Sequence, residues 1–205
     1  MRDFIRHLFP RVVLKDNLQL RYTFCLGGLA FTMFLVLLTS GALLAFYYIP
    51  HSAQAYNSIL FIEEEVFGGY FLHSLHRISA NIYLALLFLH TLRVILTGAY
   101  RPPRQWNWVV GFLLLCLGLF SGYTGYLLPM DQLALWATQT GMELVQIVPL
   151  GTLFYSFMVP DEVGAPLSLL RFYVLHIVFL PLLTLILCAI HFYKIRRQKG
   201  VLPYL

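Results

Sequence analysis

The sequence predicts an all-α integral membrane protein with four membrane-spanning helices and additional amphipathic surface helices. Of its 205 residues, 60% are hydrophobic and only 11% are charged, whereas a soluble domain of this length would carry a more charged surface. Apolar runs long enough to cross about 30 Å of hydrocarbon recur along the chain. These two observations exclude a soluble globular protein.

The simplest division of the chain is one domain, 1–205, in which a surface segment precedes four spans. The N-terminal residues interleave apolar and basic side chains, as an amphipathic segment on a membrane surface does. Each later apolar run is long enough to span a bilayer at about 1.5 Å per residue. The predicted bounds are 1–19 for the surface segment and about 21–48, 73–99, 107–128 and 170–193 for the helices.

Prolines mark the ends of several spans. Pro102 and Pro103 lie in the turn between the second and third helices, and Pro129 ends the third. Pro181 lies inside the fourth helix and predicts a kink there. The long connection 129–169 mixes apolar and polar residues at helix-like intervals, which predicts amphipathic helices along the outer membrane surface.

The charged residues are sorted between the two ends of the spans, with twelve of the fourteen cations on the side of both termini. Only Arg77 and Arg171 fall on the opposite side, together with seven of the nine acids. The positive-inside rule therefore places both termini in the cytoplasm. The net charge of +5 orients the chain in a membrane and is not evidence for nucleic-acid binding.

The second and fourth helices each carry two histidines at similar intervals. His76 and His90 are fourteen residues apart, and His176 and His191 are fifteen apart. These intervals return to within about 40° and 60° of the starting direction, so each pair shares a helix face. Because the two helices run in the same direction, we expect His76 to face His176 near the outer surface. His90 should face His191 near the inner surface.

A lone buried histidine can simply bond a neighbouring carbonyl, but ionisable residues repeated at membrane depth are usually functional. Two facing imidazole pairs about 21–22 Å apart indicate two b haems, each with histidine in both axial positions. Such an iron has no open position, which suits electron transfer rather than oxygen chemistry. The sequence therefore predicts a four-helix haem-binding bundle.

Glycines on the other two helices repeat the histidine interval. Gly27 and Gly41 are fourteen residues apart on the first helix, and Gly111 and Gly125 are fourteen apart on the third. A glycine lets a macrocycle or a backbone approach where a Cβ would clash. Ordinary small-residue packing explains any one of them, but the shared interval favours haem contacts for all four.

Haem propionates are anionic and require cations near the membrane faces. Arg77 adjoins His76 on the side that the positive-inside rule depletes of cations. The inner arginines could instead serve topology alone. The candidate propionate partners are Arg77, Arg93, Arg104 and Arg196.

Several segments together resemble cytochrome b of the quinol-oxidising complexes, and most closely the short, split form called cytochrome b6 in a bacterial variant. The resemblance covers the chain from about residue 22 to its end. Its motifs are FCLGG (24–28), SLHR (74–77), HTLRVILTGAYRPPR (90–104), GYTGYLLPMDQ (122–132), RFYVLHIVFLP (171–181) and HFYKIRRQKG (191–200).

The resemblance implies that His76 and His176 hold an outer, low-potential haem, and that His90 and His191 hold an inner, high-potential one. It also implies quinol oxidation near the outer haem and quinone reduction near the inner haem, with menaquinone as the expected quinone. One electron of each quinol would cross the membrane through the haems. The chain would then be a redox subunit, not a catalytically complete enzyme.

Two departures from the family pattern bear on the partners. Met130 stands where the Pro-Trp-Asp motif has tryptophan, which favours a bacterial cytoplasmic membrane over a thylakoid. The chain also ends before the helices that would complete an outer quinol pocket. The resemblance therefore implies a second cytochrome b half resembling subunit IV, a Rieske iron–sulfur protein or c-type cytochrome, and a homodimeric complex.

The three cysteines, Cys25, Cys116 and Cys188, lie in apolar runs and form no CxxC pair, so buried inert thiols are the simplest interpretation. In the cytochrome b6 subtype, however, a cysteine at the place of Cys25 holds an additional haem through one thioether bond. The resemblance thus implies a third, covalently attached haem beside the inner b haem.

Two other functions compete with this one. A di-haem membrane anchor would pass electrons between the quinone pool and a non-Rieske partner, such as a dehydrogenase or multihaem cytochrome. A transporter or scaffold with structural histidines would be colourless. The repeated histidine and glycine intervals favour the quinol oxidoreductase subunit over both.

Overall fold

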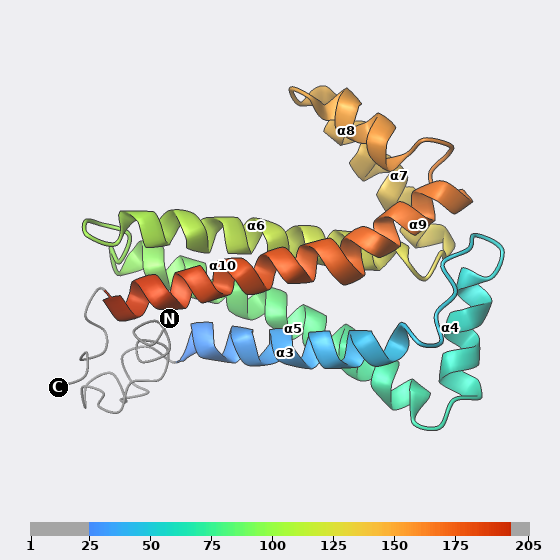
Figure 1. The fold of residues 1–205 in the computed structure, drawn as a ribbon, viewed down its shortest axis with the longest axis horizontal. Helices are drawn as coiled ribbons and strands as arrows, with labels where there is room; N and C mark the ends of the chain where they lie inside the picture. The colour runs from blue at the N-terminus through green and yellow to red at the C-terminus, as the bar shows by residue number, and fades with distance from the viewer. Residues whose placement is uncertain (1–24, 198–205) are drawn as a thin grey trace. The chain divides into compact units, whose positions relative to one another are not determined.

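The structure, a computed structural model, describes residues 25–197, and every regular element in that range is helical (Figure 1). This confirms the predicted all-α class. The elements are α3 (Leu26–Leu44), α4 (Ala55–Glu64), α5 (Gly69–Leu96), α6 (Gln105–Leu127), α7 (Gln132–Ile147), α8 (Gly151–Met158), α9 (Pro166–Val174), the π-helix η2 (Leu175–Phe179) and α10 (Leu180–Ile195).

Four helical segments are long and apolar enough to cross a membrane: Leu26–Leu44, Gly69–Leu96, Gln105–Leu127 and Pro166–Ile195. They correspond to the four predicted spans with shifted ends. The second span ends at Leu96 rather than at 99 because Gly98, with a φ of 65°, adopts the left-handed conformation that terminates helices. The fourth begins earlier than predicted, with Pro166 in its first turn, where the missing N–H is not needed.

Other predicted bounds differ at the start of the chain. The first span ends at Leu44 and is followed by turn residues 45–47, so the predicted end at 48 was wrong. The predicted surface segment 1–19 and the predicted start at 21 lie outside the described residues. Helix α4, in the connection between the first two spans, was not predicted.

The described part of the chain divides into two compact units, and the single domain expected from the sequence stays a prediction. Unit 1 comprises residues 25–33, 82–118 and 182–197, and unit 2 comprises residues 34–81 and 119–181. Each unit contains one segment of each of the four spans. Each expected histidine pair therefore lies within one unit: His76 and His176 in unit 2, and His90 and His191 in unit 1.

Unit 2 has a core that joins its span segments to the connecting helices. Ile62 of α4, Met142 of α7 and Phe172 of α9 are almost fully buried in it. The Tyr48 hydroxyl donates to the carbonyl of Leu128 at 2.7 Å, which ties the end of the first span to the end of the third. The connection 129–169 thus folds as α7 and α8, two helices of the expected amphipathic kind.

Capping side chains hold the helices of this connection. Asp131 accepts a hydrogen bond from the backbone N–H of Ala134 at 2.7 Å and caps the start of α7. Asp161 accepts bonds from the backbone N–H groups of Leu167, at 2.9 Å, and Ser168, at 3.1 Å, as well as from the Ser168 hydroxyl. Partial desolvation would raise the pKa of Asp161, but these hydrogen bonds prevail and hold it below its usual value.

The irregularity predicted by Pro181 lies just before it, as the π-helix η2. Leu180 donates its N–H to the carbonyl of Leu175, five residues earlier. Proline has no N–H to donate in the next turn, and such gaps in the helical bonding pattern favour a wider turn nearby. His176 lies within this π-helix.

Among its described residues, unit 1 consists of span segments and the turn 97–104 that joins α5 to α6. Ala30 of α3, Tyr83 of α5 and Leu114 of α6 are buried in it. Phe31 and Phe192 meet edge to face with ring centroids 5.1 Å apart, which packs α3 against α10. Large apolar side chains such as Phe112 and Ile186 are about half exposed, as expected for surfaces that contact lipid.

Candidate functional site

In unit 2, α5 and η2 bring His76 and His176 together. Their ring centroids lie 6.5 Å apart and the ring planes are inclined by 74°. A metal–imidazole bond is about 2 Å long, so two imidazoles on opposite sides of one iron have centroids roughly 6 Å apart. The observed separation is therefore close to what two axial ligands of one haem need.

Glycines of unit 2 lie directly against these two rings. A Cβ built on Gly41 of α3 would lie 3.0 Å from Cε1 of His76. A Cβ built on Gly125 of α6 would lie 2.6 Å from Cε1 of His176, which is closer than any real contact. The glycines thus leave each imidazole ring the space that a larger side chain would fill.

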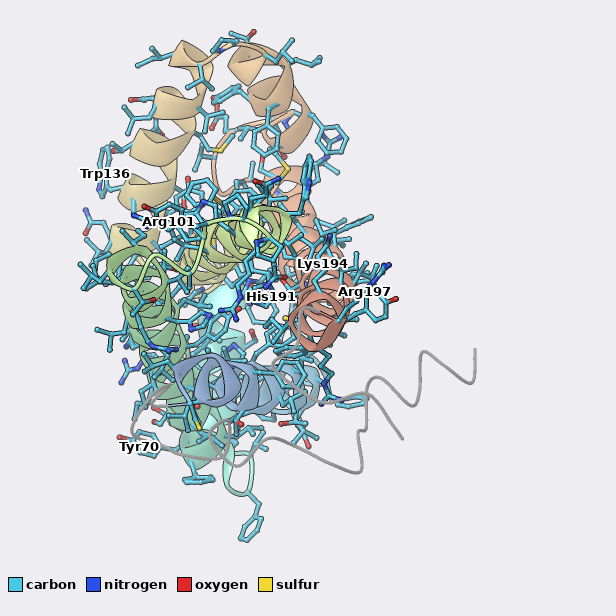
Figure 2. The ribbon with its side chains drawn as sticks, turned by 90° about the vertical axis from the view of Figure 1, so that its left-hand side faces the viewer. Tyr70, Arg101, Trp136, His191, Lys194 and Arg197 are labelled. Atoms are coloured by element: carbon cyan, nitrogen blue, oxygen red, sulfur yellow. The ribbon has the colours of Figure 1, made fainter. Side chains whose placement is uncertain are left out.

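Unit 1 repeats this construction with different residues. His90 of α5 and His191 of α10 both belong to this unit, and each lies against a glycine of another span. A Cβ on Gly27 would lie 3.2 Å from Cε1 of His90, and one on Gly111 would lie 3.2 Å from Cε1 of His191. Figure 2 shows His191 on the inner side of α10, while Lys194 and Arg197 point away from it.

The ring nitrogens of the two pairs differ in their hydrogen bonds. In unit 2, Nδ1 of His76 lies 2.9 Å from the Ser40 hydroxyl, and Nδ1 of His176 lies 3.1 Å from the Thr124 hydroxyl. In unit 1, Nδ1 of His90 and Nδ1 of His191 are buried without a hydrogen-bond partner among residues 25–197.

The available ligands fit haem better than a bare metal ion. Within residues 25–197, no group of three or more His, Cys, Asp or Glu side chains converges on one point. Structural zinc takes four protein ligands, and catalytic zinc takes three. Haem supplies four equatorial nitrogens itself and needs only two axial ligands, which is what each imidazole pair offers.

The structure brings two of the four predicted arginines together. Arg93 and Arg104 line one cavity of about 270 Å³ in unit 1, together with Arg101. Arg196 lies outside the lining of this cavity, and burial lowers its pKa. Arg77, in unit 2, is exposed.

The cysteines are not uniformly buried, which corrects the simplest interpretation of them. Cys25 and Cys116 are exposed, and Cys188 is partly buried. Cys25 directly precedes α3, has a φ of 48°, and accepts the N–H of Leu29 on its backbone carbonyl. It lies two residues before Gly27, which contacts His90.

The sequence analysis missed some of the polar residues near the sites. Nδ1 of His73, one turn before His76, lies at a hydrogen-bond distance of 2.7 Å from a carboxylate oxygen of Glu63 of α4. Ser40 and Thr124 were also missed, although a signal was present: each immediately precedes a glycine of the predicted set. The run of three glutamates that contains Glu63 gave no indication of which one would pair.

Four membrane-spanning helices that place one facing imidazole pair and two further buried histidines against glycines define a class, the helical membrane proteins built to hold haem between histidines. The comparisons with known proteins give the family. A family model described as Cytochrome b/b6/petB matches residues 12–199, and the chain belongs to the cytochrome b/b6 family. Its function is transmembrane electron transfer through b haems in a quinol oxidoreductase complex.

Two relatives illustrate the similarity. The chain is 38% identical over 200 residues to the menaquinol:cytochrome c reductase cytochrome b subunit of Geobacillus thermodenitrificans, covering 96% of this chain and 89% of that protein. It is 42% identical over 176 residues to cytochrome b6 of Heliomicrobium gestii, covering 85% and 83% of the two chains.

A solved structure shares the fold. The hyperthermophilic respiratory Complex III contains a chain with a TM-score of 0.82 and 27% identity to this one. The match covers 96% of this chain but 52% of the other, so this chain spans about half the length of that chain. The family match favours the quinol oxidoreductase subunit over the unrelated anchor and the scaffold.

Proposed function

We propose that this chain holds two b haems, one between His76 and His176 in unit 2 and one between His90 and His191 in unit 1. The observation that carries the proposal is the facing imidazole pair of unit 2, whose centroids are 6.5 Å apart. Glycines against all four rings support it. When bound, each haem takes up and releases one electron at its iron.

His76 and His176 would hold one haem through their ring nitrogens, and His90 and His191 would hold the other. Because Nδ1 of His76 and of His176 faces a hydroxyl, Nε2 of each ring is the nitrogen free to bind iron. The glycines keep the space beside each ring open, and the surrounding apolar side chains exclude water. The histidines, the glycines and the surrounding apolar side chains would together give the electrons an apolar path, and they would keep a substrate from binding the iron.

The charge distribution supports an orientation for this route. Twelve of the fourteen cations fall on the side of both termini, which by the positive-inside rule is cytoplasmic. Along α5, His76 would then lie toward the outer membrane face and His90 toward the inner one. The proposed membrane is the bacterial cytoplasmic membrane, with quinol oxidised near unit 2 and quinone reduced near unit 1.

Menaquinol is the proposed reductant, because the relative from Geobacillus thermodenitrificans is named for that quinol and for cytochrome c. The proposed partners are a second cytochrome b half, a Rieske iron–sulfur protein or c-type cytochrome, and a second copy of the complex. We therefore expect no steady menaquinol oxidation by the purified chain alone, and sustained turnover without a partner would contradict the proposed division of the pocket.

A third haem bound through Cys25 completes the proposed cofactor set. The Cys25 thiol is exposed. Cys25 lies two residues before Gly27 in the sequence, and Gly27 lies against the His90 ring of unit 1. Arg93 and Arg104, which line one cavity in unit 1, are the proposed cations for propionates there, with Arg196 as a further one. Arg77 is the proposed cation in unit 2.

Absorption spectra of the purified chain reduced with dithionite test the two-haem proposal. Wild-type protein should show two b components. His76→Ala and His176→Ala should both remove one of them, and His90→Ala and His191→Ala should both remove the other. His73→Ala is the matched control, because His73 lies on the same helix but pairs with Glu63, and both components should remain.

Two results would overturn this proposal. A colourless wild-type chain would show that it holds no haem. Loss of the same component in His76→Ala and His191→Ala would show that the ligand pairs are assigned wrongly.

A further inference from the structure

The Ser40 hydroxyl lies within hydrogen-bond distance of three atoms: the carbonyl oxygens of Val36 and, at 3.3 Å, Leu37 on its own helix, and Nδ1 of His76. Its oxygen lies 2.7 Å from the carbonyl of Val36, and a carbonyl can only accept. The single hydroxyl proton therefore points to Val36. The contact with Nδ1 of His76, at 2.9 Å, must then use the imidazole N–H as donor and the Ser40 oxygen as acceptor.

Thr124 stands in the same relation to His176. Its hydroxyl donates to the carbonyls of Phe120, at 3.0 Å, or Ser121, at 3.1 Å. Nδ1 of His176 lies 3.1 Å from the Thr124 oxygen and donates to it. Ser40 is 2% exposed and Thr124 is fully buried, so neither bond competes with water.

Unit 1 has no counterpart of this pair. Ser40 precedes Gly41 and Thr124 precedes Gly125, whereas Leu26 precedes Gly27 and Val110 precedes Gly111. Nδ1 of His90 and Nδ1 of His191 are buried and have no hydrogen-bond partner within residues 25–197. Neither unit 1 ring therefore has a hydroxyl acceptor among the described residues.

Backbone bonds from hydroxyls are common in these helices and do not by themselves indicate a role. Thr32, Thr39 and Thr97 each donate to a carbonyl four residues earlier, but all three bonds are exposed. Such bonds only satisfy the hydroxyl inside an apolar helix. Ser40 and Thr124 differ because they are buried and also contact a histidine ring.

An acceptor on the second nitrogen changes how an imidazole binds iron. It fixes the tautomer, holds the ring orientation and makes the ligating nitrogen a stronger donor. A stronger donor stabilises ferric relative to ferrous iron and so lowers the reduction potential. From this asymmetry we propose that Ser40 and Thr124 are positioning residues that lower the potential of the unit 2 haem relative to the unit 1 haem.

This inference rests on the proposed two-haem function, and redox titration of the purified haem-loaded chain tests it. Ser40→Ala and Thr124→Val each remove one acceptor, and the second keeps the side-chain shape. We expect the midpoint of the component lost in His76→Ala to rise, while the other component stays unchanged. Each variant should change the ferric-to-ferrous ratio at a fixed ambient potential by about threefold to tenfold, where tenfold is about 59 mV for one electron.

Matched variants separate the hydroxyl from general packing. Ser40→Thr and Thr124→Ser keep an acceptor and should retain the wild-type midpoint. Thr39→Val removes an exposed hydroxyl next to Ser40 that does not touch the ring and should also have no effect. Val110→Thr adds a hydroxyl before Gly111, and it should lower the midpoint of the unit 1 component.

The outcomes are distinguishable. Unchanged midpoints in haem-loaded Ser40→Ala and Thr124→Val would overturn the inference while leaving the two-haem proposal intact. If those variants lose the unit 2 haem altogether, Val110→Thr decides: a lowered unit 1 midpoint supports the inference, and an unchanged one overturns it. A wild-type chain without haem would instead overturn the proposed function.

Discussion

Units 1 and 2 carry the same arrangement of ring and glycine but surround it differently. In each unit, two histidines from the second and fourth spans lie against two glycines from the first and third. Unit 2 adds buried hydroxyls on both rings, the helices α4, α7 and α8, and a shared apolar core. Unit 1 adds an arginine-lined cavity and an exposed cysteine.

This difference separates what holds a haem from what adjusts it. The repeated histidines and glycines set the ligands and the space, which any b haem between helices needs. The hydroxyls, arginines and cysteine are not repeated, so they are the features able to give two chemically identical cofactors different properties. Variants of the repeated histidines and glycines should therefore reduce the haem content of the unit in which they lie, whereas variants of the other features should change the properties of a haem that is still bound.

The largest expected effect comes from enlarging a glycine. Gly125→Leu should remove most of the unit 2 haem, because even a Cβ there would lie 2.6 Å from the His176 ring. Gly27→Leu or Gly111→Leu should deplete the unit 1 haem less severely, since the corresponding distance is 3.2 Å. Haem content per chain, measured from reduced spectra, checks this order.

Gly28→Leu is the control for these glycine variants. It lies next to Gly27, but a Cβ there would meet nothing within 4 Å, so haem content should stay at the wild-type level. Full haem content in all of the leucine variants would mean that the glycines serve helix packing alone.

Cys25 offers a test confined to unit 1. Denaturing gels stained for haem peroxidase activity should show a stained band for the wild-type chain and none for Cys25→Ser. Both b components should remain in the native Cys25→Ser protein, because the four histidines are untouched. Cys116→Ser, which removes the other exposed thiol, should still stain. An unstained wild-type band with intact b haems would exclude the covalent haem.

The smallest expected effect concerns Asp161 in unit 2. Its folded-state pKa lies below the usual value of 3.8, so its contribution to stability is present above that pH and is lost as the pH falls through the lowered pKa. Asp161→Asn should cost about 0.5–1 kcal/mol at neutral pH through weaker capping of α9.

Thermal loss of haem absorbance in detergent measures the Asp161 effect. The difference between wild-type and Asp161→Asn protein should shrink as the pH is lowered below 4. Glu162→Gln, the neighbouring exposed acid, should behave as the wild type does at every pH. A constant difference across the pH range would mean that the carboxylate charge has no part in the capping.

The histidines and glycines could be predicted because helical periodicity alone decides which residues share a face. Intervals of fourteen on three helices and fifteen on the fourth are visible without any tertiary information. The helix ends were less predictable. Gly98 ends α5 by adopting a left-handed backbone conformation, and the sequence does not show which residue near this turn adopts it.

The polar neighbours of the rings could not be predicted in the same way. Whether the Ser40 hydroxyl reaches a ring on another helix depends on side-chain rotamers and on the closeness of two backbones. The His73–Glu63 pair depends on α4 folding back toward α5, and nothing in the local sequence selects Glu63 from its two acidic neighbours. Tertiary contacts decide both.

The π-helix η2 has a consequence for chain length. Adding one residue to an α-helix rotates everything beyond it by about 100°. The fourth span has fifteen residues from His176 to His191, one more than the fourteen from His76 to His90 in the second. In η2, the bond from Leu180 to Leu175 encloses one residue more than an α-turn does, so the surplus residue is taken up within a single turn.

The π-helix η2 therefore accommodates one inserted residue without rotating the part of the helix that follows it. Removing one residue there, such as the half-exposed Val178, should restore ordinary α-helical bonding and leave His191 on the face that its glycine partner requires. Removing Leu185 instead, further along the regular part of α10, should turn His191 away from Gly111. The span is therefore tolerant of a one-residue change in length at one turn and intolerant of it elsewhere.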